Sequence, residues 1–109
     1  NNKKDYLNLI EELLDKFGPI PEEVQNLANI SLLKIECKRI GIKKIIIKMS
    51  SIIMTCKGIE KMKEGQIKVE NISNEPKHIT QFLEKKKDIK DILKSDYEIK
   101  DGEFIITNK

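Results

Sequence analysis

The sequence contains few of the residues on which catalysis and nucleic-acid recognition most often depend. It has one histidine, His78, one arginine, Arg39, and only 5% aromatic residues in 109 positions. Arginine binds phosphates and base edges with a planar fork, and aromatic rings stack on bases, so this scarcity argues against sequence-specific recognition of nucleic acid. His78 has no sequence-marked nucleophile or metal ligand as a partner, which favours a surface or helix-capping role over catalysis.

Cysteine and phosphate-binding glycine motifs are scarce as well. Cys37 and Cys56 are the only two cysteines, and neither belongs to a Cys-x-x-Cys motif. This spacing excludes a zinc site built from this chain alone and predicts two buried, reduced thiols. Gly58 and Gly65 lack the following lysine and hydroxyl residue of a phosphate-binding loop. We therefore expect no catalytic residue, no metal site and no cofactor in this chain.

Long apolar runs are absent from the sequence. No stretch of roughly 18 apolar residues, the length of a membrane-spanning helix, exists, and no hydrophobic stretch of the kind found in signal peptides follows the first five residues. This pattern predicts a cytoplasmic protein without a membrane contact. With 39% hydrophobic and 36% charged residues, residues 1–109 are expected to form one small domain with a single core.

The charges are unevenly distributed along the chain. The net charge is +3, from 21 basic and 18 acidic residues. Residues 1–36 contain 4 basic and 7 acidic residues, a net charge of −3, whereas residues 37–109 contain 17 and 11, a net charge of +6. The run Lys85-Lys86-Lys87 could attract phosphate weakly, but the carboxylates beside it favour a solvated helix face.

The first forty residues predict a helical hairpin. Apolar residues recur at helical spacing through residues 3–17, which is typical of an amphipathic helix. Gly18-Pro19 ends this helix, because glycine readily adopts positive φ and proline cannot continue a helix. Pro21 at the first helical position, followed by two glutamates, begins a second helix that is apolar over a wide arc and ends at Gly41.

Beyond Gly41 the hydrophobic period changes to that of strands. Runs rich in isoleucine predict strands over residues 44–48 and 52–56, and a third strand is expected near 66–70. A further helix is predicted from Pro76, and its apolar spacing continues beyond the lysine run to Leu93.

The segment 97–107 predicts a β-hairpin. The dipeptide Asp101-Gly102 lies between two alternating strands and is typical of a two-residue turn. Such a turn pairs Lys100 with Glu103, Ile99 with Phe104 and Tyr97 with Ile106. The predicted fold class is therefore α+β: an N-terminal helical hairpin packed on a small, mostly antiparallel sheet, with a further helix and a C-terminal β-hairpin.

The helical hairpin and the start of the first strand carry a resemblance to a known family. The segments LLDKFGPIPEEVQNL (residues 13–27) and GIKKI (residues 41–45) resemble the C-terminal domain of bacterial transcription-repair coupling factors. The resemblance is specific over residues 7–47 and departs from the family pattern at Lys16, where arginine is usual. The motif residues, to which we assign a structural role, are Phe17, Gly18, Pro19, Pro21, Glu22, Glu23 and Gly41.

The resemblance implies a non-catalytic regulatory domain excised from a larger DNA-repair protein. In that family an ATP-driven DNA translocase displaces stalled RNA polymerase, and the C-terminal domain holds the UvrB-like module of the same chain in a closed arrangement. This contact masks the surface that recruits UvrA until polymerase is engaged. Glu12 and Asp15 match family positions that face basic residues of the UvrB-like module, and Glu11 lies beside them. An ordinary solvated helix face is the simpler alternative for these carboxylates.

Two other functions stay open from the sequence. A small nucleic-acid-binding module would use a helix together with the C-terminal hairpin as a wing, and the third candidate is an enzyme. For the regulatory domain itself, DNA would be contacted only through the rest of the parent protein.

Overall fold

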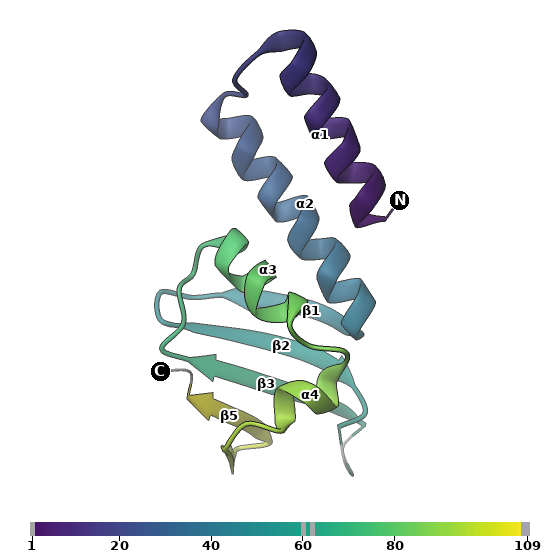
Figure 1. The fold of residues 1–109 in the computed structure, drawn as a ribbon. Coiled ribbons are helices and arrows are strands. Elements are labelled where there is room, and N and C mark those ends of the chain that lie inside the picture. The colour runs from purple at the N-terminus through teal and green to yellow at the C-terminus, as the bar shows by residue number, and fades with distance from the viewer. Residues whose placement is uncertain (1, 60, 62, 108–109) are drawn as a thin grey trace.

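The fold consists of a helical hairpin followed by a five-stranded sheet with two further helices (Figure 1). The computed structural model describes residues 2–59, 61 and 63–107. The helices and strands are α1 (Lys3–Phe17), α2 (Glu22–Ile40), β1 (Ile42–Ile47), β2 (Ser51–Lys57), β3 (Glu64–Glu70), α3 (Pro76–Glu84), α4 (Ile89–Leu93), β4 (Tyr97–Lys100) and β5 (Glu103–Thr107). This arrangement confirms the predicted α+β class.

The sheet is mixed, with strand order β1-β2-β3-β5-β4. Neighbouring strands are antiparallel except for β3 and β5, which are parallel and are connected through α3, α4 and β4. The expected mostly antiparallel sheet is therefore confirmed, and the parallel pair is a feature that the sequence did not predict. Such a pair needs a long crossover connection, which here contains both short helices.

The hydrophobic core lies between the sheet and the helices α2, α3 and α4. Alternate residues of β2, β3 and β5 face these helices, as the two-residue period of strands requires. The sheet contributes Ile52, Met54, Ile67, Val69, Phe104 and Ile106, all at most 2% exposed. The helices contribute Leu33, Cys37 and Ile40 from α2, Ile79 and Leu83 from α3, and Ile92 from α4.

The predicted thiols are confirmed as buried and unpaired. Cys37 and Cys56 are 7% and 0% exposed, and neither forms a disulfide. Burial raises the pKa of each thiol to about 11, and the carboxylate of Glu36 adds to the effect at Cys37. Both thiols are therefore protonated and unreactive near neutral pH.

The predicted register of the C-terminal hairpin is confirmed residue by residue. β4 pairs with β5 through Lys100 and Glu103, and through the two pairs Ile99–Phe104 and Tyr97–Ile106. The rings of Tyr97 and Phe104 meet edge to face, with centroids 5.1 Å apart. Ile99 nevertheless remains 57% exposed, because β4 is the edge strand of the sheet.

Two local predictions were wrong. The apolar spacing from Pro76 to Leu93 does not form one helix, because α3 ends at Glu84 and Asp88 caps a new helix by accepting a hydrogen bond from the Asp91 backbone N–H. Pro21 is not the first helical residue but the N-cap of α2. The remaining strand and helix boundaries lie within about three residues of the predicted ones.

The helical hairpin extends beyond the sheet and makes the molecule elongated (Figure 1), with dimensions of 50 × 26 × 18 Å. No residue of α1 is buried, and the buried residues of α2 begin only at Ala28. None of the helices in the described part of the chain is long and apolar enough to cross a membrane. The part of the hairpin nearest its loop is thus a free-standing pair of helices.

Candidate interdomain contact surface

The loop between α1 and α2 has a defined geometry. Gly18 ends α1 with φ 78° and ψ −158°, a combination accessible to glycine alone, and its N–H donates to the carbonyl of Leu14 at 2.9 Å. The side-chain amide of Gln25 donates to the carbonyl of Ile20 at 2.8 Å. The Pro21 carbonyl accepts the first hydrogen bond of α2, from the Gln25 N–H at 3.0 Å. These contacts set the direction in which α2 leaves the loop.

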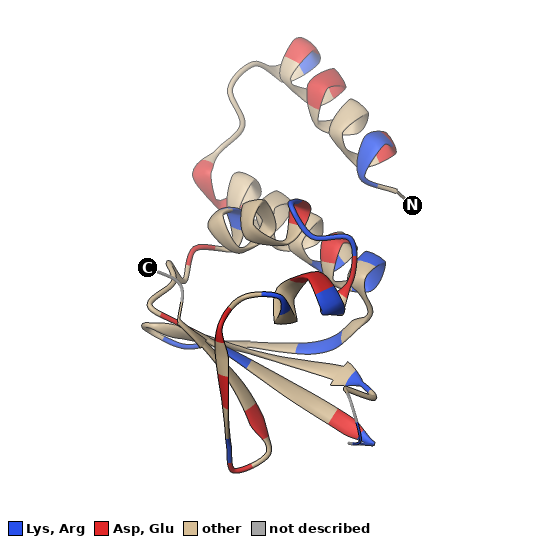
Figure 2. Ribbon diagram, turned by 60° about the horizontal axis from the view of Figure 1, so that its bottom comes forward, with Lys and Arg blue, Asp and Glu red and all other residues tan. Residues whose placement is uncertain are grey.

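The predicted contact residues Glu11, Glu12 and Asp15 form one acidic surface on α1. Residues three or four positions apart share a helix face, so Asp15 lies beside both glutamates. All three are exposed, on the side of α1 away from α2. Within the part of the chain that the structure describes, none of them forms an ion pair. Figure 2 shows acidic residues along α1 and at the start of α2. The structure therefore brings together the three carboxylates and leaves them available to a partner.

Exposed apolar residues flank this acidic surface. Leu7 and Leu14 lie two turns apart along the side of α1 that adjoins Glu11, and they are 45% and 44% exposed. At the loop, Phe17 is 77% exposed and Leu27 of α2 is 64% exposed. Contiguous apolar residues rimmed by charges are typical of protein contact sites.

The opposite end of α1 is joined to the body of the domain by ion pairs. Lys3 Nζ lies 2.6 Å from Glu84 Oε1 of α3 and 3.6 Å from Glu36 Oε1 of α2. The Glu36 side chain is 5% exposed and also pairs with Arg39 at 2.8 Å. Arg39 in turn donates to the carbonyl of Leu83 near the end of α3. One network thus connects α1, α2 and α3.

The motif residues divide between two places in the fold. The hairpin loop and the first turn of α2 contain Phe17, Gly18, Pro19, Pro21, Glu22 and Glu23. Gly41 lies at the far end of α2, where its φ of 97° ends the helix in left-handed conformation and allows β1 to begin. Its role in ending the helix was predicted, whereas its distance from the loop excludes it from any contact made there.

His78 contacts a serine and a glutamate without forming a catalytic triad. Its Nδ1 lies 2.7 Å from Ser73 Oγ and 3.5 Å from Glu75 Oε2, so both groups approach the same ring nitrogen. A triad needs the serine and the carboxylate on opposite nitrogens. The cluster instead orders the chain before α3, because Ser73 Oγ also accepts from the Glu75 N–H at 3.3 Å. Among the described residues no group of three or more His, Cys, Asp or Glu side chains could hold a metal ion.

The C-terminal hairpin has the wrong charge for a nucleic-acid-binding wing. Residues 96–103 contain four carboxylates and a single lysine. Glu98 and Asp101 are exposed on this hairpin, where they would repel phosphates. This charge distribution disfavours the alternative of a helix-and-wing module.

The sequence did not identify Leu27 as a surface residue, and it assigned Phe17 only a structural role as a motif residue. Their spacing is that of residues packed inside a hairpin, and apolar residues on a wide arc of α2 predict burial. In the structure α1 and α2 extend beyond the sheet. No other described helix or strand covers Phe17 and Leu27 there, and both side chains remain exposed. The apolar arc of α2 is wider than one neighbouring helix can cover, and this width was the sequence signal that part of it would be exposed.

The fold is a small α+β body that carries a protruding helical hairpin with an acidic and apolar surface. The TRCF domain family matches residues 1–67, from α1 into β3, and the chain belongs to this family of transcription-repair coupling factor domains. No curated protein and no solved structure matches the chain significantly.

Proposed function

We propose that this domain inhibits a bacterial transcription-repair coupling factor by contacting the UvrB-like module of the same protein. The contact masks the surface that recruits the nucleotide excision repair protein UvrA until stalled RNA polymerase is engaged. The parent protein is then an ATP-dependent DNA translocase, and this domain is its non-catalytic regulatory part. DNA is contacted only by the other parts of the parent protein.

The observation that carries the proposal is the unpaired acidic surface of α1. Glu11, Glu12 and Asp15 are exposed and form no ion pair within the described residues. Leu7 and Leu14 beside them supply apolar area that a partner can bury. Charged groups around a small apolar centre are suited to a reversible contact, in which charge sets the partner and apolar burial contributes affinity.

A masking contact acts through the difference between two states of the parent protein. In the closed state the acidic surface faces basic residues of the UvrB-like module, and in the open state it faces water. Only contacts that differ between these states shift the equilibrium. Removing the charges therefore favours the open state without altering the UvrA-binding surface itself.

The test is charge reversal with Glu12→Lys and Asp15→Lys together in the parent protein. We expect the contact to weaken by about 1–3 kcal/mol, because like charges then face each other across the interface. UvrA should bind the double variant more tightly than the wild type in the absence of polymerase. The measurement is the Kd for UvrA, together with calorimetric titration of the isolated UvrB-like module with this domain.

The matched control reverses two exposed carboxylates elsewhere, Glu64→Lys and Glu98→Lys. This control makes the same change in net charge away from α1, and UvrA affinity should stay at the wild-type level. Circular dichroism tests folding, which surface changes alter by about 0.5 kcal/mol or less. If the folded Glu12 and Asp15 variant binds UvrA with wild-type affinity, these carboxylates have no part in masking.

A further inference from the structure

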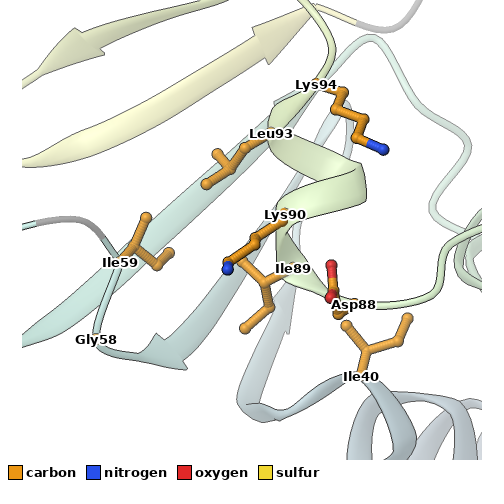
Figure 3. Close-up of a pocket in the computed structure, with 8 residues that line it drawn as sticks. All are labelled: Ile40, Gly58, Ile59, Asp88, Ile89, Lys90, Leu93 and Lys94. Carbon is orange, nitrogen blue, oxygen red and sulfur yellow. The ribbon is translucent and has the colours of Figure 1, made fainter.

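A second surface feature lies away from the acidic surface, between α4, the end of α2 and the segment that follows β2. It is a pocket of about 520 Å³ (Figure 3). Its apolar lining comes from Ile40, Ile59, Ile89 and Leu93. Ile40 and Ile59 are 5% and 3% exposed, so they form a fixed floor that is continuous with the core. A volume of this size lies in the range of roughly 300–1,000 Å³ found for binding pockets.

Lys90 of α4 and Lys94, which follows the helix, line the same pocket, and of the two only Lys94 has an ion-pair partner among the described residues. Lys94 Nζ lies 3.0 Å from Asp91 Oδ1. Lys90 forms no ion pair with any residue that the structure describes, and its side chain extends toward Ile59 (Figure 3). The pocket thus combines an apolar floor with one available ammonium group.

Asp88 and Asp91, the two described carboxylates beside Lys90, are already engaged. Asp88 Oδ1 accepts the N–H of Asp91 at 3.2 Å and caps α4. Asp91 Oδ2 accepts the N–H of Lys87 at 2.7 Å. This hydrogen bond, together with Lys94, holds the pKa of Asp91 below its ordinary value. Asp91 therefore stays ionised and paired with Lys94, while Lys90 has no ion-pair partner among the described residues.

The surroundings of the pocket are basic over a wider area than the pocket itself. The two stretches of sequence that contain most of its lining residues, 57–64 and 85–94, have eight lysines and four carboxylates, a formal excess of four positive charges. Figure 2 shows the lysines gathered along the connection between α3 and α4. An occupant with several carboxylates around one apolar group would match this distribution.

We propose that the pocket binds an acidic peptide segment of a partner protein, with one aliphatic or aromatic side chain against the isoleucine floor and a carboxylate on Lys90. Nucleic acid fits less well, because the lining offers aliphatic groups and no aromatic ring for a base. A small carboxylic acid would use Lys90 but not the wider basic surroundings. The proposal is independent of the masking contact, which uses the acidic surface of α1.

The experiment titrates the domain with a short fluorescein-labelled peptide in which glutamates and aspartates flank a central Leu-Phe pair. Anisotropy gives the Kd, and methyl spectra of ¹³C-labelled isoleucine and leucine locate the contact. We expect shift changes at Ile59, Ile89 and Leu93. Lys90→Glu should weaken binding about tenfold or more, since an attractive charge becomes repulsive.

A matched variant, Lys85→Glu, makes the same charge change on the same basic surface outside the pocket. We expect it to change the Kd less than about threefold, as for a screened rim charge. A control peptide with Ser-Ser in place of Leu-Phe should bind at least tenfold more weakly. Retained methyl spectra in both protein variants establish that they are folded.

Several results would overturn the proposal. Equal effects of Lys85→Glu and Lys90→Glu, or equal binding of the Ser-Ser peptide, would indicate diffuse attraction to the lysines. Pocket shifts with decanoate but not with the peptide would assign the site to a small carboxylic acid. Displacement of the peptide by duplex DNA at matched charge concentration, with the same dependence on Lys90, would indicate a phosphate-binding surface. The absence of any methyl shift with saturating peptide would remove the site altogether.

Discussion

At the scale of single residues, the one arginine has a structural role. Arg39 Nε donates to the nearly buried carboxylate of Glu36 at 2.9 Å, and Nη2 forms an ion pair with the same oxygen at 2.8 Å. Its Nη2 also donates to the carbonyls of Leu83 and Lys86, at 3.0 and 2.8 Å. Leu83 belongs to the last turn of α3, and Lys86 lies in the connection that follows this helix. The planar guanidinium thus joins α2 to α3 by several hydrogen bonds at once.

We expect Arg39→Ala to lower the free energy of unfolding by about 2–3 kcal/mol, because the nearly buried Glu36 carboxylate then keeps only the longer ion pair with Lys3. Arg39→Lys should give a smaller loss, since an ammonium group restores the charge but not the fork of donors. Urea unfolding followed by circular dichroism measures both.

The neighbouring exposed residue offers the control for this series. Lys38→Ala removes one positive charge from the same turn of α2 and should change stability by about 0.5 kcal/mol or less. If Arg39→Ala proved no more destabilising than Lys38→Ala, the network around Glu36 would contribute nothing measurable to folding.

At the scale of the elements, α1 differs from every other helix in how it is held. It has no buried residue, and the ion pairs of Lys3 join only its first turn to the body. The second half of α2, by contrast, contributes Leu33, Cys37 and Ile40 to the core. Local opening requires less free energy where few apolar side chains are buried.

We therefore expect the amides of α1 to exchange with solvent faster than those of residues 33–40 in α2. Native-state hydrogen exchange followed by NMR should give protection that rises from α1 to β2 and β3. Addition of the UvrB-like module should increase protection in α1 if the proposed contact forms. Equal protection of α1 and residues 33–40 in the free domain would contradict this order.

The parts of the fold that were predictable from the sequence depend on local chemistry. Gly18 and Gly41 end their helices with positive φ, a conformation that other residues adopt at a cost. The turn at Asp101 and Gly102, with φ of 50° and 79°, determines the register of the last two strands. The acidic surface was predictable for the same reason, because helical spacing alone places Glu12 beside Asp15.

The parts that were not predictable depend on residues far apart in the chain. Pairing of β3 with β5 joins Ile67 to Phe104 across the whole crossover, and no local signal specifies it. The exposure of Phe17 and Leu27 follows from where the sheet ends relative to the hairpin. The pocket is also non-local, since Ile40, Ile59 and Leu93 come from three separate segments.

At the scale of the whole molecule, charge is unevenly distributed along the chain. The N-terminal 36 residues carry a net charge of −3 and the rest a net charge of +6. The basic part nevertheless relies on lysines rather than on arginine or aromatic rings. Lysines attract phosphate as point charges without reading bases.

We expect the purified domain to bind duplex DNA no more tightly than about 10 µM at physiological salt, with an affinity that falls steeply as salt increases. Fluorescence anisotropy with a labelled duplex at two salt concentrations measures both properties. Submicromolar binding at physiological salt would revive the nucleic-acid-binding alternative.

The position of β5 in the sheet also has a consequence for how the chain is synthesised. Phe104 and Ile106 fill the centre of the core, yet they belong to the last strand that the structure describes. While the ribosome is still adding the preceding residues, one edge of β3 has no neighbour and its apolar face has no cover on that side. The nascent domain therefore completes its core only when residues 103–107 have left the ribosome. A premature stop before them would release a chain with an open strand edge, prone to aggregation rather than partly functional.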